Sequence, residues 1–327
     1  MVPFRNKFAA LALAAGVASV FGAANAAEYP SQPVRVIVPF APGGSTDIVA
    51  RIVTQRMGQE LGQTFVVENK GGAGGAIGAA EAARAKPDGY TLSIATVSTL
   101  AVLPACRPTD LPYDALTDFV PVTNFANVPN VIEVNPKFPA KNFKEFVKVL
   151  KDNPGKYSNG SSGTCSVLHL FGEAFKLATG TEAVHVPYKG SGPAVTDAVG
   201  GQIEIMFDNL PSSMAQIQAG NLRAIAIAWP ERLPSLKDVP TLAEEGYPQL
   251  NQPAWYGLLA PKGTSPEIVK KLRDAAVVAL KDPKVIEALE KQGAAPSGNT
   301  PEEFGKEIKE QFDWAKDVVA KGNIKLE

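Results

Sequence analysis

The sequence contains few of the residues on which catalytic and metal centres are usually built. Its 327 residues include two cysteines and two histidines, and these lack the ligand-pair spacing of a metal site. Basic and acidic residues are balanced, at 32 and 33, so neither a nucleic-acid-binding surface nor a polyacidic tail is indicated. Beyond the N-terminal region, no apolar run is long enough to cross a bilayer.

Two common nucleotide-binding signatures are also absent. The segment GGAGGAIG (residues 71–78) is rich in glycine, but Ile77 stands where the GxGxxG pattern requires glycine. No GxxxxGK[ST] loop occurs anywhere in the sequence. We therefore interpret residues 71–78 as a helix start with small-residue packing, and we expect no cofactor.

The first 26 residues differ from the rest of the chain. Arg5 and Lys7 precede a long apolar run, and Ala24-Asn25-Ala26 has the small-x-small pattern of a signal-peptidase site. We therefore predict a secretory signal peptide over residues 1–26, cleaved near Ala26, and a mature protein exported to the periplasm. The run contains no cysteine and is followed at once by AEYPSQP, which disfavours a lipoprotein and a retained membrane anchor.

Apolar β-type runs alternate with helical patterns through most of the mature chain. VRVIV (34–38), TFVVE (64–68) and TLSIAT (91–96) are separated by helical patterns near 47–61 and 75–86. This β-α-β-α-β order is typical of a parallel sheet with helices on both faces. Two extended segments without a helix between them follow, in FVPVTNFANVPNVIEVNP, and then a second alternation begins.

The second alternation and the C-terminal region predict the remaining elements. Asn142 is a suitable N-cap for a helix, and further helices are expected near 166–178, 193–199 and 211–219. AVHVPY, IEIMF, RAIAIAW and AWYGLLAP are expected strands, and Ser265-Pro266 and Thr300-Pro301 predict two C-terminal helices. We predict two doubly wound α/β domains: residues 27–124 plus 226–327, with residues 125–225 inserted as the second domain.

The stretch PFAPGGSTD lies between the first strand and the first helix. Gly43 and Gly44 would let a ligand approach the backbone closely, while Ser45 and Thr46 add hydroxyl donors. Free N–H groups and the helix dipole make such a helix N-terminus suited to anions. Taken alone, the stretch is explained equally well as a well-capped turn.

A second stretch, SNGSSGTCSVLHL, repeats this arrangement in the other predicted domain. Both stretches follow the carboxyl end of a strand, where open α/β sheets bind ligands. Two helix N-termini facing one cleft therefore predict a site for a small anion. Tyr188 and Lys189 in VPYKGSGP and Asp208 in FDNLP end further strands and are expected to face the same cleft.

An enzymatic interpretation has little support in the sequence. Cys165 and His169 are four residues apart and could share a helix face, a loose resemblance to a nucleophile and its base. The GSSG segment is one residue short of a GxSxG elbow. We predict no catalytic and no metal-binding residues. Instead, the even cysteine count in an oxidising compartment predicts a Cys106–Cys165 disulfide, with two free thiols as the alternative.

Together these segments resemble the Bug family of periplasmic substrate-binding proteins, the receptors of tripartite tricarboxylate transporters. The resemblance runs through YPSQPVRVIVPFAPGGSTDIVAR, VVENKGGAGGAIGAAEAARAKPDGYTL, LPYDALTDFVPV, VPYKGSGPAVTDAVGGQIEIMFDNLP, GNLRAIAIA, DVPTLAEEGYP, WYGLLAPKGT and TPEEFGKEI. It implies a periplasmic-binding-protein fold of the type II-like, Venus-flytrap kind. Two departures from the family pattern are Cys165 in the second loop and the LPACRP segment.

The resemblance also implies a ligand and partners. The ligand would be a small carboxylate (a dicarboxylate, an amino acid or an aromatic acid), held by two loops that map to residues 40–47 and 161–164. The protein would be a monomer that delivers the ligand to integral membrane subunits; a co-receptor for a sensor kinase and an enzyme using Cys165 and His169 are the alternatives. The predicted ligand-binding residues are Phe40, Ala41, Gly43, Gly44, Ser45, Asp47, Ser98, Ser161, Ser162, Gly163, Thr164, His169, Tyr188, Lys189 and Asp208.

Overall fold

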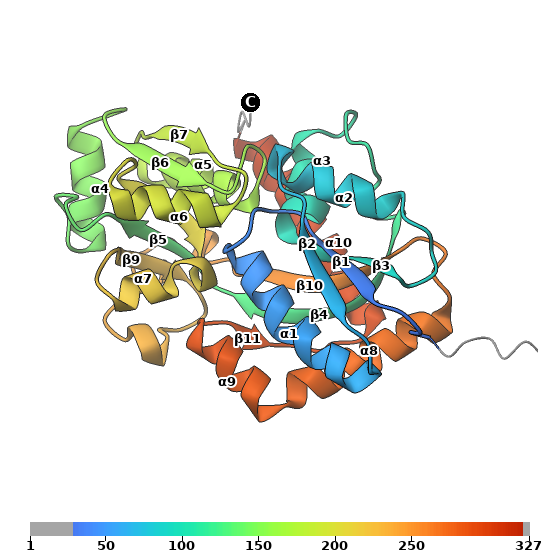
Figure 1. Cartoon of the computed structure of the whole chain (residues 1–327). Coiled ribbons are helices and arrows are strands. Elements are labelled where there is room, and N and C mark those ends of the chain that lie inside the picture. Colours follow the sequence, from blue (N-terminus) through green and yellow to red (C-terminus); the bar gives the residue numbers. More distant parts are fainter. Residues whose placement is uncertain (1–28, 323–327) are drawn as a thin grey trace, which may run out of the picture.

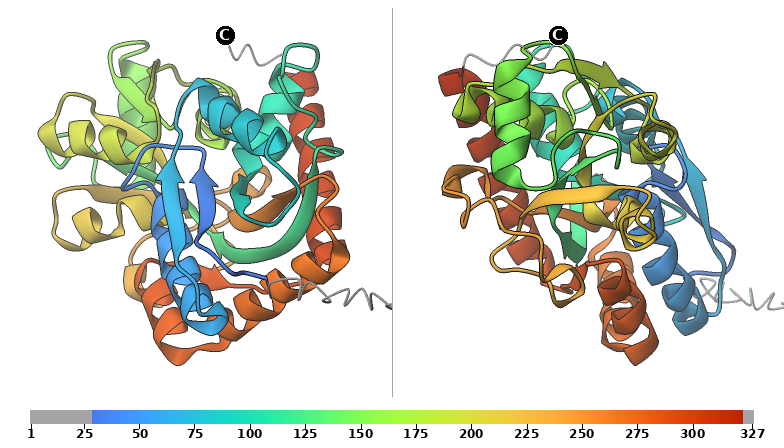
Figure 2. Two further views of the ribbon diagram at one scale, coloured as in Figure 1. Left: turned by 45° about the vertical axis from the view of Figure 1, so that its right-hand side comes forward. Right: turned by 90° about the vertical axis from the view of Figure 1, so that its left-hand side faces the viewer.

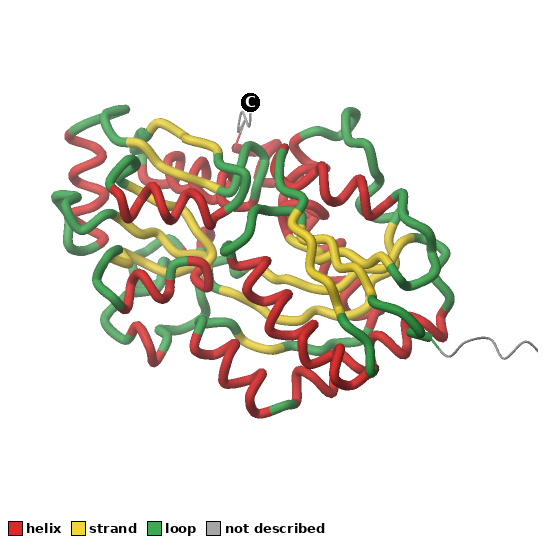
Figure 3. The backbone as a smooth tube through the Cα atoms, viewed as in Figure 1, coloured by secondary structure: helices red, strands yellow, loops and turns green. Residues whose placement is uncertain are grey.

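The computed structural model describes residues 29–322, so the predicted signal peptide lies outside the described residues. The strands form two separate sheets, each flanked by helices (Figure 3). We call the six-stranded sheet with its helices lobe 1 and the five-stranded sheet with its helices lobe 2. Lobe 2 lies at the left of Figure 1, beside lobe 1. The predicted organisation into two α/β units is therefore present.

Lobe 1 is built on a sheet with the strand order β11-β4-β10-β3-β1-β2. β1 pairs in parallel with β2 and β3, whereas β10 runs antiparallel to β3 and β4. Its strands are β1 (Val34–Val38), β2 (Phe65–Asn69), β3 (Thr91–Thr96), β4 (Phe119–Val128), β10 (Ala254–Pro261) and β11 (Ala295–Pro296).

Helices cover this sheet on both sides, and α1 and α10 lie on opposite sides of the lobe in the right-hand view of Figure 2. The helices of lobe 1 are α1 (Ser45–Leu61), η1 (Ala73–Gly75), α2 (Ala76–Ala83), the π-helix η2 (Ser98–Val102), α3 (Leu103–Cys106), α8 (Pro266–Lys281), α9 (Pro283–Lys291) and α10 (Pro301–Gly322). None of the helices within residues 29–322 has the length and apolar character needed to cross a membrane.

Lobe 2 has the strand order β7-β6-β8-β5-β9. Asn142 caps its first helix, as predicted, because its side chain accepts a hydrogen bond from the Glu145 N–H. The elements of lobe 2 and of the segment after it are β5 (Asn130–Val134), α4 (Phe143–Asp152), β6 (Ser158–Ser161), α5 (Val167–Thr179), β7 (Val184–Pro187), α6 (Ser191–Gly200), β8 (Ile205–Asn209), η3 (Leu210–Ser212), α7 (Met214–Gln218), β9 (Arg223–Ala228), η4 (Pro234–Leu236) and η5 (Pro248–Leu250).

The chain passes between the lobes twice. It enters lobe 2 at Pro129, between β4 and β5, and it returns through residues 229–253, between β9 and β10. The domain limits expected after residues 124 and 225 lie inside β4 and β9. We propose that the domains are instead divided at Pro129 and within residues 229–253.

Both sheets are mixed, whereas the sequence predicted parallel sheets. The reason is where the chain enters each lobe. Asn130, the first residue of β5, pairs with Asn209, the last residue of β8. β5 thus enters at the edge where β8 ends, which makes it antiparallel, and β10 enters lobe 1 in the same way beside β3.

Candidate functional site

A small cavity lies between the lobes, at the edge where β1, β3 and β8 end. Its volume is about 10 Å³, roughly the space of one water molecule. In this arrangement of the lobes the cavity is too small for a metabolite. Every lining side chain is uncharged: the lining residues are Phe40, Gly44, Ser45, Thr46, Thr96, Val97, Ser98, Ser162, Val167, Ser191, Asn209, Ala254 and Tyr256.

The N-terminus of α1 forms one wall of this cavity. Gly44 is the N-cap, no side chain caps the first-turn N–H groups, and Gly44, Ser45 and Thr46 line the cavity. Gly44 has a φ of −83°, which any residue can adopt. A Cβ there would lie 3.5 Å from the backbone nitrogens of Ser191 and Gly192, an ordinary contact distance, so position 44 lies directly against the start of α6.

Those two nitrogens belong to α6, which provides a second helix N-terminus. α6 is also capped by a glycine, Gly190, and Ser191 lines the cavity. Two positive helix-dipole ends thus face each other across the lobes, an arrangement that an anion between them would stabilise. A helix near residues 193–199 was predicted from the sequence, but its N-terminus was not predicted as an anion-binding site.

α5 provides the third helix N-terminus at the cavity. Its N-cap Ser166 accepts a hydrogen bond from the His169 N–H through its side chain. The N–H of Val167, the first helical residue, donates to Ser98 Oγ of lobe 1 over 2.9 Å. Ser162, from the 161–164 loop, and Ser98 both line the cavity.

Hydrogen bonds join the lobes on the α1–α6 side of the cavity. The Ala41 N–H donates to the carbonyl oxygen of Lys189 over 3.0 Å. Ser45 Oγ donates to the carbonyl oxygen of Asn209 over 2.7 Å and accepts from the Ser212 N–H over 2.9 Å. In this closed arrangement Ala41 and Lys189 contribute backbone groups to the contact between lobes.

Glycines allow the backbones of the two lobes to approach each other. A Cβ at Gly74 would lie 2.4 Å from the Thr164 carbonyl oxygen, and a Cβ at Gly192 would lie 2.3 Å from the Pro42 carbonyl oxygen. The glycine-rich segment 71–78, interpreted from sequence as a helix start, is therefore also part of the contact surface between lobes. Its glycines follow no motif spacing, so the sequence contained no signal for this role.

Asp47 lies behind the first loop rather than in the cavity. Its carboxylate accepts hydrogen bonds from the Gly43 N–H over 3.1 Å, and from Arg51 and Asn69, each over 2.9 Å. Burial raises the pKa of Asp47, but these hydrogen bonds outweigh burial and hold the pKa below its usual value. In this structure Asp47 holds the loop in shape.

Nine other predicted residues also lie outside the cavity lining: Ala41, Gly43, Ser161, Gly163, Thr164, His169, Tyr188, Lys189 and Asp208. Ser161 Oγ shares a 2.7 Å hydrogen bond with His185 Nε2, and Tyr188 donates to Asp197 over 2.8 Å. His169 accepts the Cys165 N–H on Nδ1. Asp208 accepts a hydrogen bond from the Ser212 hydroxyl. Their role toward a ligand stays a prediction.

A buried acidic pair lies beneath the cavity. Asp208 on β8 and Glu133 on β5 are both fully buried. Burial raises the pKa of Asp208 to about 6, although hydrogen bonds from neighbouring hydroxyls lower it. Burial and the charge of Asp208 raise the pKa of Glu133.

Several cavity residues were not predicted as site residues. Tyr256 donates to Asn209 Oδ1 over 2.8 Å, and Asn209 Nδ2 donates to Asn130 Oδ1 over 2.5 Å. These three side chains come from β10, β8 and β5, which meet at the lobe crossings. The position of Asn209 at a strand end had already placed it toward the cleft, whereas Tyr256 comes early in an apolar strand and was not predicted.

The cysteines are joined in a disulfide, with Cα atoms 6.1 Å apart. Cys165 therefore has no thiolate to act as a nucleophile, which argues against the enzymatic interpretation.

The two histidines stack on each other, with their ring centroids 3.7 Å apart. Burial lowers the pKa of His185 to about 4, and the neighbouring His169 lowers it further. Within residues 29–322, no three His, Cys, Asp or Glu side chains are grouped to hold a metal ion.

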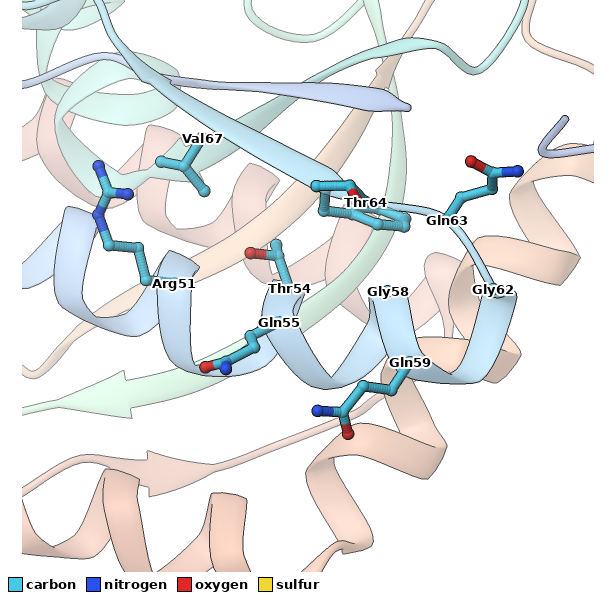
Figure 4. A pocket seen from close by; sticks show the side chains of 10 residues that line it. Arg51, Thr54, Gln55, Gly58, Gln59, Gly62, Gln63, Thr64 and Val67 are labelled. Carbon is cyan, nitrogen blue, oxygen red and sulfur yellow. The ribbon is translucent and has the colours of Figure 1, made fainter. Parts of the chain in front are cut away.

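A larger hollow lies away from this cavity, on the outside of lobe 1. It has a volume of about 590 Å³ and runs between α1 and β2. Figure 4 shows Gln55 and Gln59 on α1 and Val67 on the strand beside it. Polar side chains and open solvent surround it, without helix N-termini directed into it, so the interlobe cavity is the stronger candidate.

Comparison with known proteins assigns the chain to a family. A family model described as the tripartite tricarboxylate transporter family receptor matches residues 49–324. The chain belongs to this receptor family. Protein BugT of Bordetella pertussis is 39% identical over 310 residues, which cover 94% of this chain and 95% of BugT. The predicted Bug family membership is thus confirmed.

Solved structures share the fold of this receptor. A structure described as that of a periplasmic transporter is 78% identical, with a TM-score of 0.91 over 91% of this chain and 100% of its own. R. palustris Rpa4515 with adipate is 33% identical (TM-score 0.87, 90% and 99% covered). MatC from Rhodopseudomonas palustris with bound malate is 34% identical, with a TM-score of 0.85 over 89% of this chain and 100% of its own. The predicted periplasmic-binding-protein fold is confirmed.

Proposed function

We propose that this receptor binds a small carboxylate in the interlobe cavity and delivers it to the membrane subunits of a tripartite tricarboxylate transporter. The observation that carries the proposal is the convergence of α1, α5 and α6 N-termini on one cavity without a charged lining side chain. Backbone N–H groups, hydroxyls and helix dipoles are then the groups that recognise the anion.

The relatives support a dicarboxylate as the first class to test. Adipate and malate are both dicarboxylates, and they are bound by proteins that are 33% and 34% identical to this chain. A carboxylate at the α1–α6 helix ends would bridge the lobes and stabilise closure. A second carboxylate, an ammonium group or an aromatic ring would then determine which acid is preferred.

The remaining parts of the proposal concern export, oligomeric state and delivery of the ligand. The predicted signal peptide would export the chain, and the mature receptor would act as a monomer that binds without chemical conversion of its ligand. The family to which the chain belongs supports delivery to membrane subunits.

The proposal is tested by a thermal-shift screen of small mono- and dicarboxylic acids, sugars and amines. A ligand at about a hundred times its dissociation constant adds roughly 2.7 kcal/mol to the free energy of unfolding, which such a screen detects. We expect acids alone to raise the melting temperature. Equal shifts from neutral sugars or amines would contradict the proposal. Native mass spectrometry of the purified protein would identify any retained acid.

A further inference from the structure

The disulfide joins the two lobes beside the cavity. Cys106 is the last residue of α3 in lobe 1, and Cys165 follows the cavity loop between β6 and α5 of lobe 2 (α3 and α5 in Figure 1). The chain itself crosses between lobes at Pro129 and in residues 229–253. The disulfide is therefore a third covalent connection between the lobes.

The segment around Cys165 is packed into lobe 1. Cys165 is 3% exposed, and Leu168 and Leu170 are fully buried in the hydrophobic core that lobe 1 forms. Cys165 also has a φ of 59°, in the left-handed region that residues other than glycine rarely adopt. Its surroundings, including the covalent bond, hold it there.

The opposite side of the cavity is held differently. Between the loop before α1 and the loop before α6 the lobes are joined by the hydrogen bond from the Ala41 N–H to the Lys189 carbonyl oxygen. Such a bond contributes about 0.5–1.5 kcal/mol, so this side can open. Cystine Cα atoms stay within roughly 4.4–6.8 Å of each other, so the lobes cannot part at Cys106–Cys165.

We propose that the Cys106–Cys165 disulfide fixes the α5 edge of the cavity, so that the lobes open on the α1–α6 side. Val167 shares one pocket with Asn130 and Pro253, residues of the two lobe crossings. Val167 is two residues after Cys165, so the tether lies on the same side of the cavity as these crossing residues. The fixed edge keeps Ser162 and Val167 beside Ser98 before a ligand arrives, which lowers the ordering cost of binding.

The proposal is tested by hydrogen exchange on ligand-free protein, so it does not depend on which acid binds. Wild type is compared with the double variant Cys106→Ser, Cys165→Ser. In wild type we expect the peptide with Val167 to exchange slowly and the peptide with Ala41 quickly. In the double variant we expect exchange at Val167 to rise about tenfold or more, with little change at Ala41.

A matched control separates loss of the tether from general destabilisation. Phe175→Leu truncates the lobe 2 core without touching lobe 1, and we expect it to speed exchange across lobe 2 without singling out Val167. Reduction of wild type provides a second tether-free form should the double variant not fold. Unchanged Val167 exchange in the tether-free form, slow exchange at both peptides in wild type, or two alkylatable thiols in periplasmic wild type would each overturn the proposal. None of these outcomes would contradict the proposed binding of a carboxylate.

Discussion

At the scale of single residues, Gly192 lies where the backbones of the two lobes approach each other closely. The Cβ of any other residue would lie 2.3 Å from the Pro42 carbonyl oxygen and 3.3 Å from the Gly44 nitrogen. Both atoms belong to lobe 1, whereas Gly192 belongs to lobe 2. A side chain at this position would obstruct closure without filling the core of either lobe.

We therefore expect Gly192→Ala to weaken binding of the preferred acid by about tenfold or more, roughly 1.4 kcal/mol. Gly200→Ala, at the other end of α6, is the matched control because no atom lies within 4 Å of its added Cβ. Titration calorimetry measures both affinities. Urea unfolding is measured in parallel, since residue 192 precedes Pro193 and the helical conformation is less favoured there. Equal affinities in two folded variants would contradict the role of Gly192.

The buried acids Glu133 and Asp208 predict a pH dependence of stability. Their pKa values are raised in the folded state, that of Asp208 to about 6, so the native protein retains protons that the unfolded chain releases. The stabilisation is complete below the unfolded pKa, about 4, and is lost as pH rises through about 6. The substitution Glu133→Gln removes the contribution of Glu133 to this stabilisation.

We expect the free energy of unfolding of Glu133→Gln, relative to wild type, to increase between pH 4.5 and pH 7.5. Urea unfolding at the two pH values measures this difference. Glu231→Gln, at an exposed position, is the control and should give the same difference from wild type at both values. A Glu133→Gln variant that also keeps a constant difference from wild type would show that the pair does not retain a proton.

At the scale of elements, helix starts were predictable because their chemistry is local. Asn142 and Ser265 cap α4 and α8 through their own side chains, as their sequence neighbours indicated. α9 was not predicted, although Asp282 before Pro283 carries the same signal and its side chain accepts the Lys284 N–H. The direction of β5 and β10 was not predictable, since it depends on where the chain enters each lobe.

Substitution of two helix-capping residues distinguishes effects on stability from effects on ligand binding. Asn142 caps α4 at an exposed site, whereas Ser166 caps α5 beside the cavity and is fully buried. We expect Asn142→Ala and Ser166→Ala each to lower the free energy of unfolding by about 1 kcal/mol. Only Ser166→Ala should weaken acid binding, because it loosens the start of α5. Urea unfolding and calorimetry measure the two effects, and an equal loss of affinity in both variants would contradict this assignment.

At the scale of the whole molecule, the site is made by closure of two lobes. The loops at residues 40–47 and 161–164 were predicted from sequence, because glycine and hydroxyl residues follow strands in each half. The opposition of Gly44 to Ser191 and the contact of Gly74 with Thr164 were not, because they join segments distant in sequence. Such contacts depend on the angle between lobes, and no local pattern encodes that angle.

The central claim is that the cavity recognises the charge of a carboxylate through helix N-termini. Its most direct test is calorimetric titration with the acid that gives the largest thermal shift, beside the methyl ester of the same acid. The ester keeps most of the size but removes the charge. Hydrogen bonds to charged groups contribute about 1.5–3 kcal/mol each. Loss of two should weaken binding by on the order of a hundredfold or more. An ester that binds as tightly as its acid would contradict the claim.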